Sequence, residues 1–324
     1  MWVEILCGLV VYQLIRRYFG SEEEFYDVDS SHSDVVFAVA SRLEKLYGGR
    51  CFVGLRIPDQ ETGSRQHIDI VLVTKREVMV VAVKNFLGFI GIDKDGNWTC
   101  SAAKNNKPET YPDPVPEIDR QVAILQSYFE QRGVPLPKGH MMGRVVLPNP
   151  NCRPTYSIAC QPEIVTFEKW RELKPDSKTG ISNWIKDAFH GSKSELQDGL
   201  YQKLQFILST SPMWDRLELK GDRNILGEFM EFKGNQGDMQ ALKNLKRSKV
   251  SRLIVQKSTL FGSFGRSRLQ ILYSPRDYRS DGASADEWKE IAVKPNTEVL
   301  FQQLNSKKAR KFKISSVVSL TLSA

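Results

Sequence analysis

Apolar and polar residues follow two different patterns along the chain, and the change falls near Pro212. Before it, stretches with apolar residues three or four positions apart, which predict helices, alternate with short β-branched runs, which predict strands. The helical stretches are 34–49, 117–133, 181–190 and 194–210, and the strand runs are 51–57, 68–74, 78–84, 143–150 and 162–167. Residues 88–102 predict a hairpin that turns at Asp95-Gly96.

This alternation predicts an α/β fold for residues 33–210, because helices placed between strands cover a sheet. Several strands follow one another without a helix, which is typical of antiparallel hairpins, so a simple doubly wound sheet is not expected. The expected fold class is therefore α/β with α+β character: a mixed sheet flanked by helices.

Residues 211–324 have a different pattern of apolar and polar residues. Short apolar runs separated by turn residues occupy 224–234, 250–258, 268–274, 290–294, 297–304 and 310–323, and few helical stretches intervene. This pattern predicts a small, mostly β domain, either a barrel or a sandwich.

The first 20 residues form an apolar segment that ends in Arg16 and Arg17. A helix that spans a membrane needs about 20 mostly apolar residues, and Met1 to Ile15 supplies 15 that include Glu4. A membrane anchor, an interfacial helix and a helix packed on the protein itself all remain open. The arginine pair would keep the following chain on the cytosolic side, so we expect an intracellular protein, membrane-associated if the segment inserts. Residues 21–32 read as an acidic linker.

Charge is distributed unevenly along a chain whose net charge is +8. Residues 212–324 contain 21 basic and 12 acidic residues, a net charge of +9, and the rest of the chain is close to neutral. A basic part of this kind favours a polyanion such as nucleic acid, anionic lipid or an acidic protein, although a solvated basic face explains it equally well. No protein partner can be identified from the sequence. Five cysteines without a CxxC pair and four histidines do not support a zinc module or a disulfide framework.

Two basic clusters are candidate nucleic-acid contacts: Arg266 and Arg268 in "FGSFGRSR", and Lys307, Lys308, Arg310 and Lys311 in "NSKKARKFK". The first combines arginines with aromatic residues, which can contact phosphates and stack on bases. It is equally compatible with a flexible hairpin tip. The second can meet phosphates or anionic lipid, or it can be a charged edge strand that resists aggregation.

Two predicted strands bring together residues that suit phosphodiester cleavage. An acid on one strand and an acid-x-lysine on the next would meet at one end of the sheet, because residues two apart share a face. Such acids can hold Mg²⁺, which polarises the phosphate and activates water. Asp69 and Lys84 fit this arrangement. The second acid is missing, because Ala82 stands where it is expected.

Residues 33–150 resemble the nuclease-related domain, NERD, a family placed in the PD-(D/E)xK restriction-endonuclease-like superfamily. The resemblance rests on Lys84-Asn85, Gly88, Gly91 and Trp98, together with Asp69 and a helix that carries Gln121. It implies a restriction-endonuclease-like mixed sheet with Asp69, Lys84 and Gln121 at the catalytic site.

The departures from the family pattern concern the chemistry. His67 replaces the glutamate of a Glu-x-Asp, Ala82 replaces the metal-binding acid of a Glu-x-Lys, and Ser33-Asp34 aligns with a Gly-Glu. The resemblance thus implies that Asp69, with Asp34, could hold Mg²⁺ if the protein is active. The favoured hypothesis is a nuclease-like protein with a degenerate site that binds nucleic acid or another polyanion with little or no cleavage. The alternatives are an active Mg²⁺-dependent nuclease with a relocated acid and a membrane-anchored interaction protein.

Overall fold

The computed structural model describes residues 32–101, 108–173, 198–257, 269–275 and 288–323. The predicted N-terminal segment and linker (1–31), the helical stretch 181–190, and Arg266 with Arg268 lie outside these residues. Within the described ranges, no helix combines the length and apolar character needed to cross a membrane.

A five-stranded sheet forms the first part of the molecule, with strand order β1-β2-β3-β7-β9. Strands β1, β2 and β3 pair antiparallel, whereas β3–β7 and β7–β9 pair parallel. The predicted mixed sheet is therefore confirmed. Its strands are β1 (Arg50–Pro58), β2 (Arg65–Val73), β3 (Val78–Val83), β7 (Met141–Val146) and β9 (Ile164–Val165).

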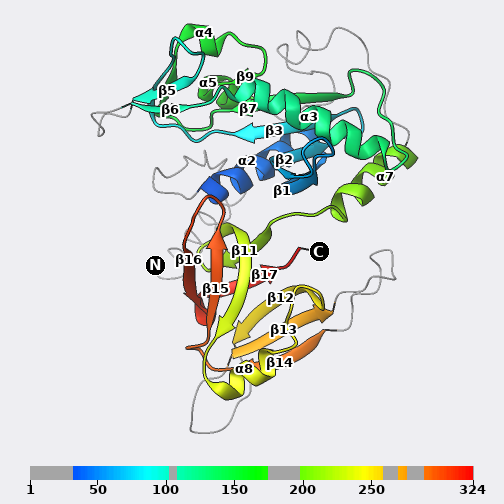
Figure 1. Ribbon diagram of the computed structural model, residues 1–324, viewed down its shortest axis with the longest axis vertical. Coiled ribbons are helices and arrows are strands. Elements are labelled where there is room, and N and C mark those ends of the chain that lie inside the picture. The colour runs from blue at the N-terminus through cyan, green and yellow to red at the C-terminus, as the bar shows by residue number, and fades with distance from the viewer. Residues whose placement is uncertain (1–31, 102–107, 174–197, 258–268, 276–287, 324) are drawn as a thin grey trace, which may run out of the picture.

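Two long helices cover opposite faces of this sheet, and Figure 1 shows α3 on one side of β3 and α2 on the other. Helix α3 (Pro114–Glu130) packs Ile118, Leu125 and Phe129 on one face, and α2 (His32–Tyr47) buries its apolar residues on the other. The sequence pattern placed the start of α3 three residues late. The helix begins inside the proline-rich loop because Pro114 suits the first helical turn and Asp113 caps the N–H of Val115.

A small four-stranded sheet, in the order β6-β5-β4-β8, stands beside the main sheet. It contains the predicted hairpin of β4 (Gly88–Ile92) and β5 (Trp98–Ser101), and it is completed by β6 (Glu109–Tyr111) and β8 (Cys152–Pro154). The short helices α4 (Tyr156–Ala159) and α5 (Phe167–Glu172) follow, and α7 (Asp198–Ser209) leads to the second part of the chain.

The second part is an eight-stranded, fully antiparallel sheet in the order β14-β13-β12-β17-β10-β11-β15-β16. The β-rich prediction is confirmed. The sequence pattern missed β10 and the short helix α8 (Gln236–Leu242). The strands are β10 (Asp215–Leu219), β11 (Arg223–Lys233), β12 (Val250–Lys257), β13 (Leu269–Pro275), β14 (Lys289–Val293), β15 (Glu298–Gln303), β16 (Ala309–Lys313) and β17 (Val317–Thr321), with a 3-10 turn at Ile314–Ser316.

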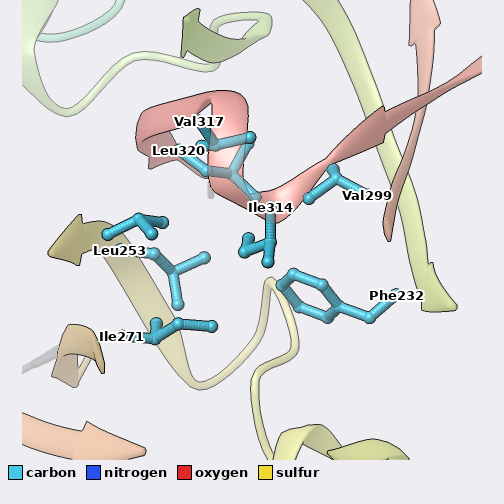
Figure 2. Close-up of a pocket in the computed structure, with 8 residues that line it drawn as sticks. Phe232, Leu253, Ile271, Val299, Ile314, Val317 and Leu320 are labelled. Carbon is cyan, nitrogen blue, oxygen red and sulfur yellow. The ribbon is translucent and has the colours of Figure 1, made fainter. Parts of the chain in front are cut away.

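This sheet encloses its own apolar core, which contains a small void of about 10 Å³. Figure 2 shows side chains such as Phe232, Leu253 and Val299 converging on it. Only apolar residues line the void. Because a buried water needs polar partners, the void is a packing defect and offers no recognition groups to a ligand.

Candidate functional site

Asp69 lies where the pairing of β2 and β3 ends. The last paired residues are Ile70 and Val81. Beyond them, Oδ2 of Asp69 accepts the backbone N–H of Val83 at 2.8 Å. The Asp69 side chain is only 12% exposed. Its carboxylate therefore takes the place of a β2 carbonyl and satisfies the backbone N–H of Val83 inside the sheet.

The second oxygen of Asp69 faces His67. Nε2 of His67 lies 2.9 Å from Oδ1 of Asp69, and Nδ1 of His67 accepts the indole N–H of Trp214 at 3.0 Å. An indole nitrogen can only donate, so Nδ1 must accept and the proton of a neutral His67 sits on Nε2. His67 therefore donates to Asp69, and Trp214 determines that it does.

His32, at the start of α2, places its Nε2 3.7 Å from the same carboxylate oxygen. Burial by itself raises the pKa of the Asp69 carboxyl. The neighbouring imidazoles of His32 and His67 outweigh burial and hold this pKa well below its usual range. Asp69 is thus an ionised carboxylate with donors at both oxygens.

Trp214 reaches this site because residues 212–214 run along the outer edge of β1. The N–H of Trp214 bonds to the carbonyl of Gly54, and the N–H of Arg56 bonds to the carbonyl of Pro212, both at 2.8 Å. Gly54 has φ +70° and interrupts the ladder opposite Asp69. A residue with a Cβ is strained in this conformation, so glycine permits the turn that offers its carbonyl to Trp214.

Arg56 stacks on the indole of Trp214. Its guanidinium lies 4.0 Å from the centre of a Trp214 ring and forms an ion pair with Glu228 of β11 at 2.8 Å. A cation over an aromatic face is attracted to the ring. Asp69, His67, Trp214, Arg56 and Glu228 therefore form a continuous chain of contacts from β2 to the eight-stranded sheet, which we call the Trp214 clasp.

The lysine predicted for the site lies just beyond β3 and pairs with an acid that the sequence analysis missed. Nζ of Lys84 lies 3.1 Å from Oε2 of Glu117, in the first turn of α3. Gln121, four residues further along α3, is buried and donates to the carbonyl of His67 at 3.1 Å. Ala82 is 2% exposed and belongs to the apolar core. The spacing of Glu117 and Gln121, one helical turn apart, was the signal available in the sequence.

Asp34 is directed to a different place. Its Oδ1 accepts the backbone N–H of Asn224, and Oγ of the neighbouring Ser33 accepts the N–H of Leu226 at 3.2 Å. Both acceptors therefore serve β11. Asp34 joins α2 to the eight-stranded sheet, and the contacts of Asp69 are made by His67, His32 and Val83.

These residues do not fit a Mg²⁺ site. Magnesium takes oxygen ligands in near-octahedral geometry, but a methyl group stands at Ala82, so Asp69 is the one carboxylate that β2 and β3 offer, and each of its oxygens also accepts a hydrogen bond, from His67 or Val83. Nε2 of His67 could bind a metal only if the ring proton moved to Nδ1. The N–H at Nδ1 would then face the indole N–H of Trp214, and two donors cannot form a hydrogen bond. Among the described side chains, no group of three His, Cys, Asp or Glu residues could hold a metal ion.

The basic cluster of 305–313 lies partly in the turn between β15 and β16 and partly on β16, at the edge of the eight-stranded sheet. Lys307, Lys308, Arg310 and Lys311 are all exposed. Lys311 lies 3.6 Å from Glu298 on β15. Positive charge is therefore displayed along an open strand edge that no other described strand covers.

Comparison with protein families identifies one region of the chain: residues 32–148 match the model of the nuclease-related domain, NERD. The match confirms the resemblance inferred from the sequence and coincides with the main sheet and its helices up to β7. No curated protein and no solved structure matches the chain.

Proposed function

We propose that this chain, in which residues 32–148 correspond to a nuclease-related domain, is a nuclease-fold protein that binds nucleic acid through its basic β-sheet and does not cleave it. The observation that carries the proposal is the bond from Trp214 to His67, which commits His67 to donate to Asp69. The carboxylate that a nuclease would use to hold a metal serves here as a structural acceptor.

Three departures from a cleavage site support this. Ala82 contributes a buried methyl group where a second acid is required. Lys84, which would stabilise charge on a phosphate, is paired with Glu117. Asp34, the acid that the sequence offered as a substitute, accepts a backbone N–H of β11. The Ala82 and Asp34 departures weaken a metal site, because such a site depends on one or two carboxylates. The pairing of Lys84 with Glu117 instead lowers the charge available to a phosphate.

The binding half of the proposal rests on charge. Residues 212–324 carry a net charge of +9, and the exposed lysines and arginines of β16 and of the turn before it lie on an open edge. Contacts of this kind neutralise phosphates, so the affinity falls steeply as salt concentration rises.

Binding is tested with fluorescein-labelled DNA and RNA and the full chain over a series of salt concentrations. The double variant Lys307→Glu, Lys308→Glu should weaken binding about tenfold and flatten the salt dependence, because each lost phosphate contact lowers the slope by about one. The variant Lys45→Glu, Lys138→Glu makes the same charge change at exposed positions of the nuclease-related part and should bind almost as the wild type does. Equal loss in both variants would contradict a site at β16.

A second candidate is an active nuclease in which Glu117 supplies the missing acid. The observation that favours it is the position of Glu117, within 3.1 Å of Lys84 and 3.4 Å of the amide of Gln121. The two candidates differ in one variant. Glu117→Gln should abolish any cleavage if Glu117 is the acid, whereas on the favoured proposal wild type and Glu117→Gln both leave the nucleic acid intact.

A further inference from the structure

The small sheet displays an aromatic side chain on its outer face. Phe89, on β4, is 62% exposed, although burying a phenyl ring would stabilise the fold. The next residue, Ile90, and the paired strand's Trp98 are fully buried on the opposite face. Ile90 and Trp98 are therefore packed on the inner face of the small sheet, and the phenyl ring of Phe89 lies on its outer face.

Polar residues that suit nucleic acid surround this ring. Phe89 is in register with Ser101 on β5 and with Arg153 on β8. Residues opposite one another on paired strands share a face, so Ser101 and Arg153 flank Phe89 on this face. Nη1 of Arg153 donates to the carbonyls of Pro150 at 2.6 Å and Cys152 at 3.1 Å. Both neighbours are exposed.

Gly91 leaves space beside the ring. A Cβ at this position would lie 3.5 Å from Oγ1 of Thr99 and 3.9 Å from Cγ2 of Thr155. The absence of a side chain at Gly91 thus lowers the surface of the sheet next to Phe89, between two threonines. The space above Gly91 allows a planar group, such as a nucleic-acid base, to stack against the ring of Phe89.

The charge on this face has one sign. The outward positions that the strand register defines are Phe89, Gly91, Thr99, Ser101, Thr110 and Arg153. They include one cation and no carboxylate. At these six positions a polyanion therefore meets no charge of its own sign.

We propose that this face of the small sheet binds single-stranded nucleic acid, with a base stacked on Phe89 and a phosphate near Arg153. Bases stack on exposed aromatic side chains with little sequence preference, because every base has a π face. A duplex keeps its bases stacked internally, so the Phe89 face selects single strands. The inference rests on the proposed function, since it names a contact for the nucleic acid that β16 attracts.

The test measures the affinity of the full chain for labelled oligo-dT and oligo-U and for a DNA duplex of equal length. Phe89→Ala and Phe89→Leu should each weaken single-strand binding about tenfold, because both remove the stacking ring. Phe89→Tyr should retain it, and duplex binding should be unchanged in all three variants. Phe206→Ala, at a phenyl ring on α7 that is 53% exposed, is the matched control and should have no effect.

Two results would overturn the inference and leave the proposed function in place: single-strand binding that is unchanged in Phe89→Ala, or binding that Phe89→Leu retains, which would indicate an apolar contact without stacking. Failure of the wild type to bind single strands or duplex at low salt would instead remove the proposed function, and this inference with it.

Discussion

The indole N–H of Trp214 donates to Nδ1 of His67 over 3.0 Å, although 147 positions separate the two residues. This bond places a residue from the start of the second part of the chain next to the acid of the nuclease-related domain. Because His67 must then donate from Nε2, Trp214 controls what the Asp69 carboxylate receives. The same contact joins the two parts of the chain and engages the partner of the Asp69 carboxylate.

Trp214→Phe removes the donor and keeps an aromatic ring beneath Arg56. Nδ1 of His67 should then lose its hydrogen-bond donor, which is visible as a change in the ¹⁵N shift of that nitrogen, while Nε2–H still donates to Asp69. We expect a loss of about 1 kcal/mol in the free energy of unfolding, the usual net contribution of one hydrogen bond. Trp170→Phe is the control for the His67 shift, because Arg42 also stacks on that ring but the His67 shifts should not move. An unchanged His67 spectrum in Trp214→Phe would contradict the clasp.

Asp69→Asn should destabilise the fold at neutral pH. An asparagine that accepts the N–H of Val83 presents its amide donor to Nε2–H of His67, and Trp214 prevents His67 from switching tautomer. One buried donor is left unsatisfied, at a cost of about 1–3 kcal/mol. Urea denaturation of the two proteins measures the difference.

The same pair of proteins reports the ionisation of Asp69. Its pKa is lowered in the folded state, so the wild type gains stability above the unfolded-state pKa of about 3.9 and loses that gain as the pH falls towards the folded-state pKa. The free-energy gap between wild type and Asp69→Asn should therefore be constant from about pH 7 to pH 5 and narrow below about pH 4. A gap that widens in acid would show that Asp69 is protonated in the fold.

Gly54→Ala should destabilise more than Gly63→Ala. Both glycines have left-handed backbone angles, with φ +70° and +68°, so both substitutions carry the conformational cost of about 1–2 kcal/mol. Only at Gly54 does a Cβ meet another side chain closely, Cδ1 of Leu226 at 3.1 Å on β11, whereas nothing lies within 4 Å at Gly63. Equal costs in thermal denaturation would show that β11 does not pack against β1 at Gly54.

The four described cysteines should differ in reactivity. Cys160 is exposed, whereas Cys152 is 1% exposed and burial raises its pKa to about 12. Because the thiolate is the reactive form, iodoacetamide at pH 8 should modify Cys160 in the native protein and Cys152 only after unfolding. Peptide mass spectrometry distinguishes them, and rapid labelling of Cys152 in the native protein would contradict the packing of β8.

Much of the fold could be predicted from local patterns. The apolar runs of β2 and β3 and the spacing in α2 and α3 each depend on nearby residues, and these elements form close to where the patterns placed them. Strand β10 was missed because it has only five residues, three of them charged, and so lacks a clear apolar run. It pairs with its neighbour β11 as well as with the distant β17.

The site divides in the same way. The position of Ala82 two residues before Lys84 could be read from the sequence, because it depends on spacing along one strand. The hydrogen bonds of His67 and Asp34 could not be predicted. Trp214 donates to His67 and Asn224 donates to Asp34, and both donors come from distant segments of the chain. Asp34 was a reasonable substitute acid from its order in the sequence, but the direction of its side chain depends on how β11 lies against α2.

The most direct test is cleavage of labelled single- and double-stranded DNA and RNA by the full chain, with Mg²⁺ or Mn²⁺, beside Asp69→Ala as the background control. If Trp214 and His67 hold Asp69 as a structural acceptor, the wild type should cleave no faster than Asp69→Ala on any substrate. Cleavage by the wild type that disappears in Asp69→Ala would show that Asp69 is a working catalytic acid and would contradict the account.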